Sequence, residues 1–190
     1  MNQPMIVQNR STAKEIFSIV LGVLLALGAN ALWQNRQQQK TVEIFVEAIK
    51  LEVLQNKEWV LEVLPYHQSV RDTLMFIQQD PARQEDFQFF DVWRGAGAPK
   101  IRDTAYETAV FSGVLPHMEY ALASEITGVY RQQSELKFLF ERYFAGALAG
   151  DPADQERFMG IASMMTVDVA LAEERLIADY DALIELIENQ

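Results

Sequence analysis

An uncharged apolar run over residues 16–33 (IFSIVLGVLLALGANALW) constrains the fold of this chain more than any other feature. Backbone N–H and C=O groups find no water in hydrocarbon, so a single segment that crosses a bilayer has to be an α-helix. At ~1.5 Å per residue the run extends ~27 Å, close to the ~30 Å hydrocarbon core of a bilayer. Trp33 closes the run, and an indole ring favours the membrane interface. The run therefore predicts a transmembrane helix over residues 15–33, preceded by a cytoplasmic tail over residues 1–14.

A cleaved signal peptide is the alternative for this segment. Arg10 and Lys14 would form its basic region, and residues 29–31 (ANA) have the small-x-small form of a cleavage site. Cleavage there would release a soluble helical protein into the periplasm. The apolar run is long for a signal peptide and continues past this site to Trp33, which favours a retained anchor.

Small or hydrogen-bonding side chains recur every four residues in this segment, at Ser18, Gly22, Ala26 and Asn30. A spacing of four residues places them on one face of a helix. Small residues let membrane helices approach closely, and an amide near lipid gains from a hydrogen bond across the contact. We therefore predict that these four residues form the contact face for another membrane helix, although small residues are common in membrane helices in general.

The same segment resembles the opening of a family of uncharacterised bacterial single-pass membrane proteins, a domain of unknown function. The resemblance rests on Glu15, Ile16, Gly22, Ala26, Leu27, Asn30 and Trp33. The chain departs from the pattern at Ala31-Leu32, where a further Asn and the Trp are expected, and Ser112-Gly113 is similar to a turn between helices in that family. The resemblance implies a helical domain on the periplasmic side of the bacterial inner membrane. It implies no activity, because the family has none assigned.

Composition limits the chemistry and the partners of the rest of the chain. The net charge is −11: residues 1–33 carry +1 and residues 34–190 carry −12, so the later part repels nucleic-acid phosphates and anionic lipid headgroups. The chain has no cysteine, which removes disulfides, thiol catalysis and cysteine-ligated metals. Basic residues nearly balance across the apolar run, so the periplasmic placement rests on the short tail before it and on the resemblance.

The helix that starts in the membrane is expected to continue beyond it. Gly28 is the last Gly or Pro before Pro65, and from residue 42 apolar positions recur at spacings of four and three. This repeat is typical of the seam of a helix bundle or coiled coil. The seam continues past Pro65, which predicts a kink there rather than an end. Its members are Val42, Val46, Ile49, Val53, Asn56, Val60, Val63, His67, Val70, Leu74 and Ile77, widened by Phe45, Leu54, Leu61 and Leu64.

Three further long or medium helices are expected downstream. Asp80-Pro81 would stop the first helix, and a short aromatic helix or turn would follow within residues 83–93. The later helices are predicted over residues 104–111, over residues 115–148, and from the junction Gly150-Asp151-Pro152 to about Glu188, with Asp151 as N-cap.

No stretch shows the alternation of a half-buried strand. The sequence therefore predicts an all-α fold, in which the N-terminal transmembrane helix continues into an antiparallel three- or four-helix bundle over residues 34–190.

The sequence contains no recognisable catalytic or metal-binding motif. Neither His67 nor His117 has a Glu three residues earlier, as a di-iron bundle requires. His67 is interpreted as a buried, hydrogen-bonded seam residue, and a bis-histidine haem between the two has no positive support. Ser112, with His117 and Asp103, lacks the G-x-S-x-G elbow of a serine hydrolase.

Two further groups near the C-terminus have ordinary interpretations. Met159, Met164 and Met165 are read as flexible core filler rather than a soft-metal site. The carboxylates that include Glu173-Glu174 are interpreted as a solvated helix face.

We therefore expect a non-enzymatic, membrane-anchored helical-bundle protein that uses no cofactor and no metal. It would serve as a scaffold or accessory subunit whose partners are the lipid bilayer and a second membrane protein or a second copy of itself, with no nucleic acid. A periplasmic bundle that senses or binds a small ligand is the alternative, and it would need a partner to carry a signal because its cytoplasmic tail is short.

Overall fold

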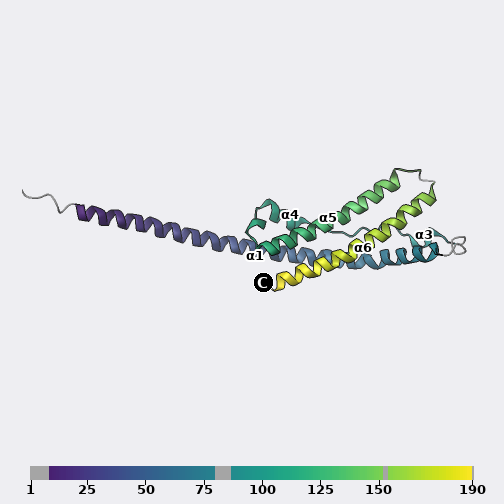
Figure 1. The fold of residues 1–190 in the computed structure, drawn as a ribbon, viewed down its shortest axis with the longest axis horizontal. Coiled ribbons are helices and arrows are strands. Elements are labelled where there is room, and N and C mark those ends of the chain that lie inside the picture. Colours follow the sequence, from purple (N-terminus) through teal and green to yellow (C-terminus); the bar gives the residue numbers. More distant parts are fainter. Residues whose placement is uncertain (1–8, 80–86, 152–153, 190) are drawn as a thin grey trace, which may run out of the picture. The chain divides into compact units, whose positions relative to one another are not determined.

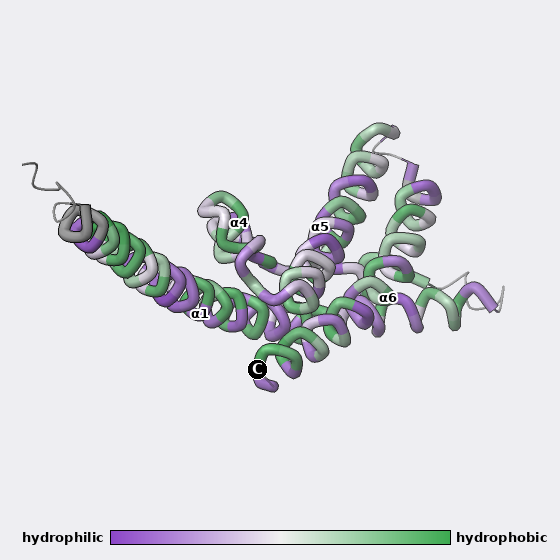
Figure 2. Tube along the Cα trace, turned by 60° about the vertical axis from the view of Figure 1, so that its left-hand side comes forward, coloured by the Kyte–Doolittle hydropathy of each residue, from purple (hydrophilic) through white to green (hydrophobic). Residues whose placement is uncertain are grey.

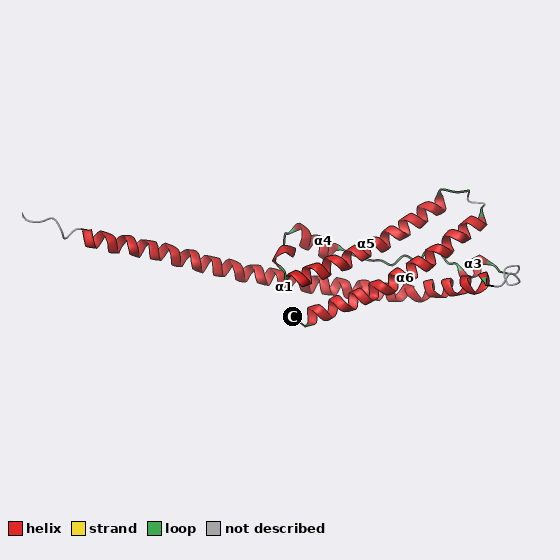
Figure 3. Ribbon diagram, in the orientation of Figure 1, coloured by secondary structure: helices red, strands yellow, loops and turns green. Residues whose placement is uncertain are grey.

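The structure, a computed structural model, describes residues 9–79, 87–151 and 154–189. Within these ranges the chain forms five α-helices, one 3₁₀ turn and no strand (Figure 3), which confirms the predicted all-α class. The elements are α1 (Asn9–Gln78), α3 (Phe89–Val92), α4 (Thr104–Phe111), the 3₁₀ turn η1 (Leu115–His117), α5 (Tyr120–Leu148) and α6 (Gln155–Glu188) (Figure 1). They belong to two compact units, residues 1–44 and residues 45–190, which are described in turn.

In the first unit, the early part of α1 exposes apolar side chains on every face. All side chains over residues 14–37 are exposed, and the large apolar ones from Ile16 to Trp33 are 45–68% exposed. Figure 2 shows this apolar stretch along the early part of α1. Among the described residues, α1 is the helix that is long and apolar enough to cross a membrane.

In the second unit, α1 continues through Pro65 and ends at Gln78. A proline inside a helix removes one backbone hydrogen bond and crowds the preceding turn, so the helix needs support from its packing. Leu64 and His67, on either side of Pro65, are both buried. The prediction that the helix continues through Pro65 is confirmed, and the predicted stop at Asp80-Pro81 lies outside the described residues.

The core of the second unit draws on the later part of α1, on α5 and on α6. Each helix buries a stripe of side chains at spacings of three and four residues, as expected of helices that each pack one face. Most of the predicted seam of α1 is buried: Ile49, Val53, Asn56, Val60, His67, Val70 and Leu74. The stripes of α5 and α6 include Leu122, Ile126, Val129, Leu136, Met165, Val169, Leu176, Tyr180 and Leu183.

Polar contacts between α1 and α6 fix the direction in which the two helices run. In order along α1 they are Lys50–Glu188, Lys57–Asp181, His67–Glu173 and Gln68–Glu174. From Lys50 to His67 along α1 the partners fall from Glu188 to Glu173 along α6, so the two helices are antiparallel.

Contacts of α5 complete this arrangement. Tyr130 and Gln133 of α5 contact Glu52 and Asn56 of α1, in the same order along both helices, so α1 and α5 run parallel. The pair α5 and α6 is antiparallel, because Tyr143 contacts Asp168 and Gly146 contacts Arg157.

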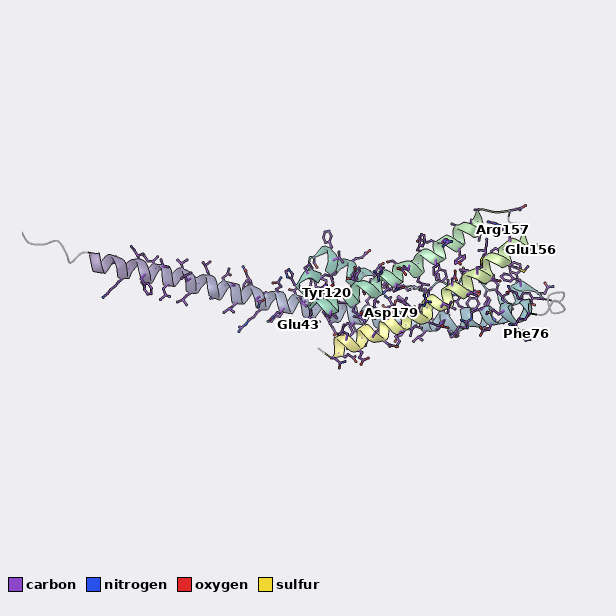
Figure 4. All side chains as sticks on the ribbon, viewed as in Figure 1. Glu43, Phe76, Tyr120, Glu156, Arg157 and Asp179 are labelled. Atoms are coloured by element: carbon purple, nitrogen blue, oxygen red, sulfur yellow. The ribbon has the colours of Figure 1, made fainter. Side chains whose placement is uncertain are left out.

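Arg157, at the start of α6, ties the end of α5 to α6. Its Nη2 donates to the Gly146 carbonyl at 2.7 Å. Its guanidinium also lies so close to Gly150 that a Cβ there would come within 1.4 Å of Nη1. Figure 4 labels Arg157 beside Glu156 at this end of α6. A side chain at Gly150 would therefore displace the Arg157 guanidinium from this position.

Two details of the predicted α1 seam are wrong. Leu54 and Leu61, expected to widen the seam, are 37% and 46% exposed. Leu64 is buried while its neighbour Val63 is only half-buried. The apolar stripe of α1 is therefore narrower than the sequence pattern indicates.

Two helix starts also differ from the predictions. Residues 115–117 form η1, Met118 is extended, and α5 begins only at Tyr120 with Glu119 as its N-cap. The N-cap of α6 is Asp154 rather than Asp151, since Asp154 Oδ1 accepts from the Arg157 N–H at 3.0 Å.

The connection over residues 94–103, here called the strap, has no regular secondary structure. Polar side chains of α1 satisfy much of its backbone. Asn56 accepts from the Arg102 N–H at 2.9 Å and donates to the Arg102 carbonyl at 2.6 Å. Just after the strap, Glu52 accepts from the Ala105 N–H at the start of α4. Backbone groups that leave water need such partners, which explains polar residues in the seam of α1.

Candidate functional site

A cavity of about 510 Å³ lies in the second unit, between the segment from α3 into the strap, the end of α5 and the start of α6. Its aromatic lining residues are Phe90, Trp93, Tyr143, Phe144 and Phe158. Aliphatic side chains and the backbone of the strap complete the wall, and none of the lining residues within the described ranges carries a charge. A volume and character of this kind are typical of small-molecule sites.

The rim of this cavity leaves large apolar side chains in contact with solvent. Phe90 and Phe144 are each 63% exposed, and Leu148 is 70% exposed. The one phenol in the wall is already engaged, because the Tyr143 hydroxyl donates to Asp168. Partial burial and this hydrogen bond raise the pKa of Tyr143 to about 12, so the phenol stays neutral. The cavity therefore offers apolar contact and almost no charge.

An aromatic cluster fixes the floor of the cavity. Phe89 stacks on Trp93 at 5.7 Å between ring centroids, and its ring meets Phe158 edge-on at 5.9 Å. Phe89 also packs with Val70 of α1 and Ala162 of α6. Aromatic pairs in these geometries add about 0.5–1.5 kcal/mol each beyond the area they bury. The four-residue helix α3 is thus held by side-chain packing rather than by its own length.

Two consecutive residues of α1, directly after Pro65, hold the strap where it forms the cavity wall. The Tyr66 hydroxyl donates to the Gly95 carbonyl at 2.7 Å and accepts from the Arg94 N–H at 2.9 Å. His67 Nε2 lies 2.8 Å from the Ala96 carbonyl. Gly97 adopts φ +60, and a Cβ there would lie 2.9 Å from His67 Nε2. We call Tyr66 and His67 the clamp.

The hydrogen-bond partners of His67 determine where its ring protons lie. A carbonyl oxygen only accepts, so Nε2 carries the proton that points at Ala96. Nδ1 lies 2.8 Å from Glu173 Oε2, and both side chains are fully buried. One proton is therefore shared between Nδ1 and this carboxyl oxygen. Both ring nitrogens of His67 are engaged, which explains how an imidazole is accommodated in an apolar seam.

Glu173 overturns the interpretation of its helix face as solvated. It is fully buried, whereas its neighbour Glu174 is partly exposed and accepts from Gln68. Burial raises the pKa of the Glu173 carboxyl, and the hydrogen bond to His67 opposes that rise. Glu173 Oε1 accepts no hydrogen bond within the described ranges. The sequence signal for this residue was its position one helical turn from Val169 and Leu176, on the apolar stripe of α6.

A second buried polar group lies further along the same core. The Tyr130 hydroxyl donates to Glu52 at 2.7 Å, and burial followed by this bond raises the pKa of Tyr130. Tyr180 is fully buried, and its hydroxyl finds no partner among the described residues. The long core of this unit therefore contains two polar sites, one around Glu52 and one around His67.

The predicted membrane contact residues lie apart from this cavity, in the first unit. Ser18, Gly22, Ala26 and Asn30 are all exposed and no described residue covers them. A Cβ at Gly22 would meet nothing within 4 Å. No described residue of this chain therefore covers the predicted contact face.

The residues considered for catalysis and cofactors are not assembled into a site. The Ser112 hydroxyl donates to the Ala109 carbonyl, and Asp103 binds Lys137 at 2.6 Å, so neither addresses His117. No group of three or more His, Asp or Glu residues within the described ranges is arranged to hold a metal ion. His67 has no free ring nitrogen for a haem iron.

Comparison of the chain with known protein families, with curated proteins and with solved structures finds no match. The resemblance of the N-terminal segment to a family of single-pass membrane proteins therefore stays a prediction.

Proposed function

We propose that the protein is a single-pass protein of the bacterial inner membrane, anchored by residues 15–33. Residues 34–190 would form a helical bundle in the periplasm, and the protein would act without catalysis as a scaffold or accessory subunit. The observation that carries this proposal is the early part of α1, where every side chain over residues 14–37 is exposed although most of those from Ile16 to Trp33 are apolar.

Water strongly disfavours such a surface. Burying a Leu, Ile, Val or Phe side chain is worth about 1.5–3 kcal/mol. Summed over the large apolar residues from Ile16 to Trp33, this exceeds the whole stability of an ordinary domain, about 5–15 kcal/mol. A bilayer covers all faces of a helix at once, as this pattern requires.

The bundle assignment has support from the contacts in the second unit. Helix α6 runs antiparallel to both α1 and α5, and all three bury one stripe each. The segment between α1 and α5, which includes the strap, returns the chain to the start of α5. An up-and-down arrangement with the strap in the place of a fourth helix accounts for these contacts.

The contact with a partner is assigned to the face formed by Ser18, Gly22, Ala26 and Asn30. Gly22 has open space around it, so another helix can approach the backbone closely. An apolar tip around α4 offers a further surface, since Phe111 is 95% exposed and Tyr120 is 86% exposed.

Crosslinking in membranes tests this proposal. The chain has no cysteine, so Ala26→Cys gives a unique attachment point for a photoreactive crosslinker. We expect a discrete adduct with one membrane protein or with a second copy, identified by mass spectrometry after extraction in mild detergent. Gly22→Leu should abolish the adduct, and Leu24→Ala, on another face, should leave it unchanged. An adduct that survives Gly22→Leu contradicts the proposed face.

A further inference from the structure

We infer that the cavity beside the clamp is a binding site for an uncharged, apolar small molecule. This inference goes beyond the scaffold role and does not depend on it, because the cavity and the membrane segment belong to different units of the chain.

The chemistry of the wall selects the ligand class. None of the described residues that line the cavity is charged, so an ionic ligand would lose its hydration without gaining a counter-ion from them. Three polar groups of the wall already have partners: the Gly95 and Ala96 carbonyls accept from the clamp, and the Tyr143 hydroxyl donates to Asp168. An apolar ligand therefore leaves these three groups with the partners they already have.

The wall is also held in place before any ligand arrives. Gly95 and Ala96 are fixed by two side chains of α1, and Gly97 fits against His67 only because it has no side chain. A preformed site binds more tightly than one that has to order itself, because less conformational entropy is lost. The buried pair of His67 and Glu173 thus supports the wall without lining the cavity.

The rim indicates that the cavity receives a ligand from outside rather than being filled by the core. Phe90, Phe144 and Leu148 stand around it with more than half of their surface exposed. A volume of about 510 Å³ falls within the range of cavities that hold drug-sized molecules.

Photolabelling of the full chain tests the site. The probe is 3-(trifluoromethyl)-3-phenyldiazirine, a small uncharged aromatic molecule, applied to the protein in detergent and in lipid nanodiscs. Tryptic digestion places the lining residues other than Gly95 and Ala96 in three peptides, 84–94, 143–157 and 158–175, which are separate from the membrane peptide 15–36. The membrane peptide reports the local probe concentration. We expect labelling of the three cavity peptides that saturates and is displaced by N-phenyl-1-naphthylamine, whereas labelling of the membrane peptide rises without saturation.

Two filling variants make the test specific. Ala147→Phe from α5 and Ile161→Phe from α6 place a ring in the cavity. Each filling variant has a matched control on the same helix, Ala145→Phe on α5 and Met164→Phe on α6. Both control positions are exposed and do not line the cavity. We expect each filling variant to lower labelling of the cavity peptides by roughly tenfold or more, with unchanged membrane labelling and melting temperature, and each control to have no effect. If one filling variant does not fold, the labelling of the other tests the inference.

Three results overturn the inference. Cavity labelling that never saturates, or that is equal in filling and control variants, means that the cavity has no ligand site. Saturable labelling in detergent that disappears in nanodiscs means that a lipid chain occupies the cavity instead of a free small molecule. Protection from the probe that grows with protein concentration, together with crosslinks between copies at Phe144, means that a second copy covers it.

Discussion

The two parts of α1 show how one continuous helix is built for two surroundings. Over residues 14–37 every side chain is exposed and most of those from Ile16 to Trp33 are apolar, so no face is favoured. From Phe45 to Gln78 the same helix buries a single stripe, and the rest of its surface mixes polar residues with a few exposed apolar ones such as Leu51 and Leu61. A helix that is apolar all round needs an apolar solvent, whereas a helix with one apolar stripe needs a packing partner within the protein.

The two parts also differ in how they treat polar residues. In the later part, Asn56 and His67 lie in the buried seam, and each has hydrogen-bond partners in the strap or in the other helices. In the early part, Ser18 and Asn30 are exposed and have no such partners among the residues that the structure describes. The comparison teaches that buried polar side chains of the second unit are mostly hydrogen-bonded within that unit, whereas the polar side chains of the first unit lie on an exposed surface.

The largest expected effect comes from a charge placed in the buried stripe. Val53 is fully buried, so Val53→Asp leaves a carboxylate without water or a partner and should lower the free energy of unfolding by about 3–5 kcal/mol. Leu51→Asp, on the 58% exposed side of the same helix, should change it by less than ~0.5 kcal/mol. Chemical denaturation of both variants measures the difference, and equal losses would show that the faces of α1 are misassigned.

The next effect concerns the clamp. Gly97→Ala forces an L side chain into φ +60 and places its Cβ 2.9 Å from His67 Nε2, which should cost about 1–3 kcal/mol. The control is Gly128→Ala, within α5 and with open space around it, which should stabilise by up to about 1 kcal/mol. Thermal unfolding gives both values. A neutral Gly97→Ala would mean that the strap does not rest on His67.

The pH dependence of stability tests the buried carboxyl. The pKa of Glu173 is raised in the folded state, so its contribution is fully present below its ordinary value near 4.5 and is lost as pH rises through the folded-state pKa. Glu173→Gln cannot ionise. We therefore expect the melting temperature of Glu173→Gln, relative to the unchanged chain, to rise between about pH 4 and about pH 8.

Glu174→Gln is the matched control for that experiment. It removes the neighbouring carboxylate, which is partly exposed, and should give a difference that hardly varies with pH. Two parallel profiles would mean that Glu173 is not buried as the structure places it.

The smallest effects on folding are expected in the first unit. Gly22→Leu and Asn30→Leu should each change the free energy of unfolding of the second unit by less than ~0.5 kcal/mol, because both residues are exposed. Association in membranes should respond instead. A hydrogen bond between membrane helices is worth about 0.6–2 kcal/mol, so Asn30→Leu should weaken crosslinking less than Gly22→Leu, which blocks close packing. A larger loss of crosslinking in Asn30→Leu than in Gly22→Leu would mean that the Asn30 amide, rather than close packing at Gly22, makes the main contact.

Local rules predicted much of the fold. The seam repeat predicted that α1 continues through Pro65, and the turn predicted at Ser112-Gly113 gave the correct end of α4. The same rules misplaced the start of α5, because Pro116 and the extended Met118 form a separate turn that residue periodicity does not show.

The candidate site could not be predicted from the sequence, because its parts meet only in three dimensions. Glu173 looked like one of several solvated carboxylates, and its partner His67 is 106 positions away in the chain. The strap has no periodicity, so nothing local indicated that Tyr66 and His67 hold its backbone. The cavity arises where the aromatic residues around α3 meet the end of α5 and the start of α6.

One measurement tests the central claim, that α1 lies in lipid first and packs in a protein core afterwards. Single cysteines along residues 16–77, possible because the chain has none, would carry spin labels in lipid nanodiscs. We expect high oxygen and low nickel-chelate accessibility at every position from 16 to 33. From residue 45 to residue 77 we expect the accessibility of the spin labels to vary with a period of ~3.6 residues. The lowest accessibility is expected at Ile49, Val53 and Val60. Nickel access throughout residues 16–33, or uniform access over residues 45–77, would contradict the account.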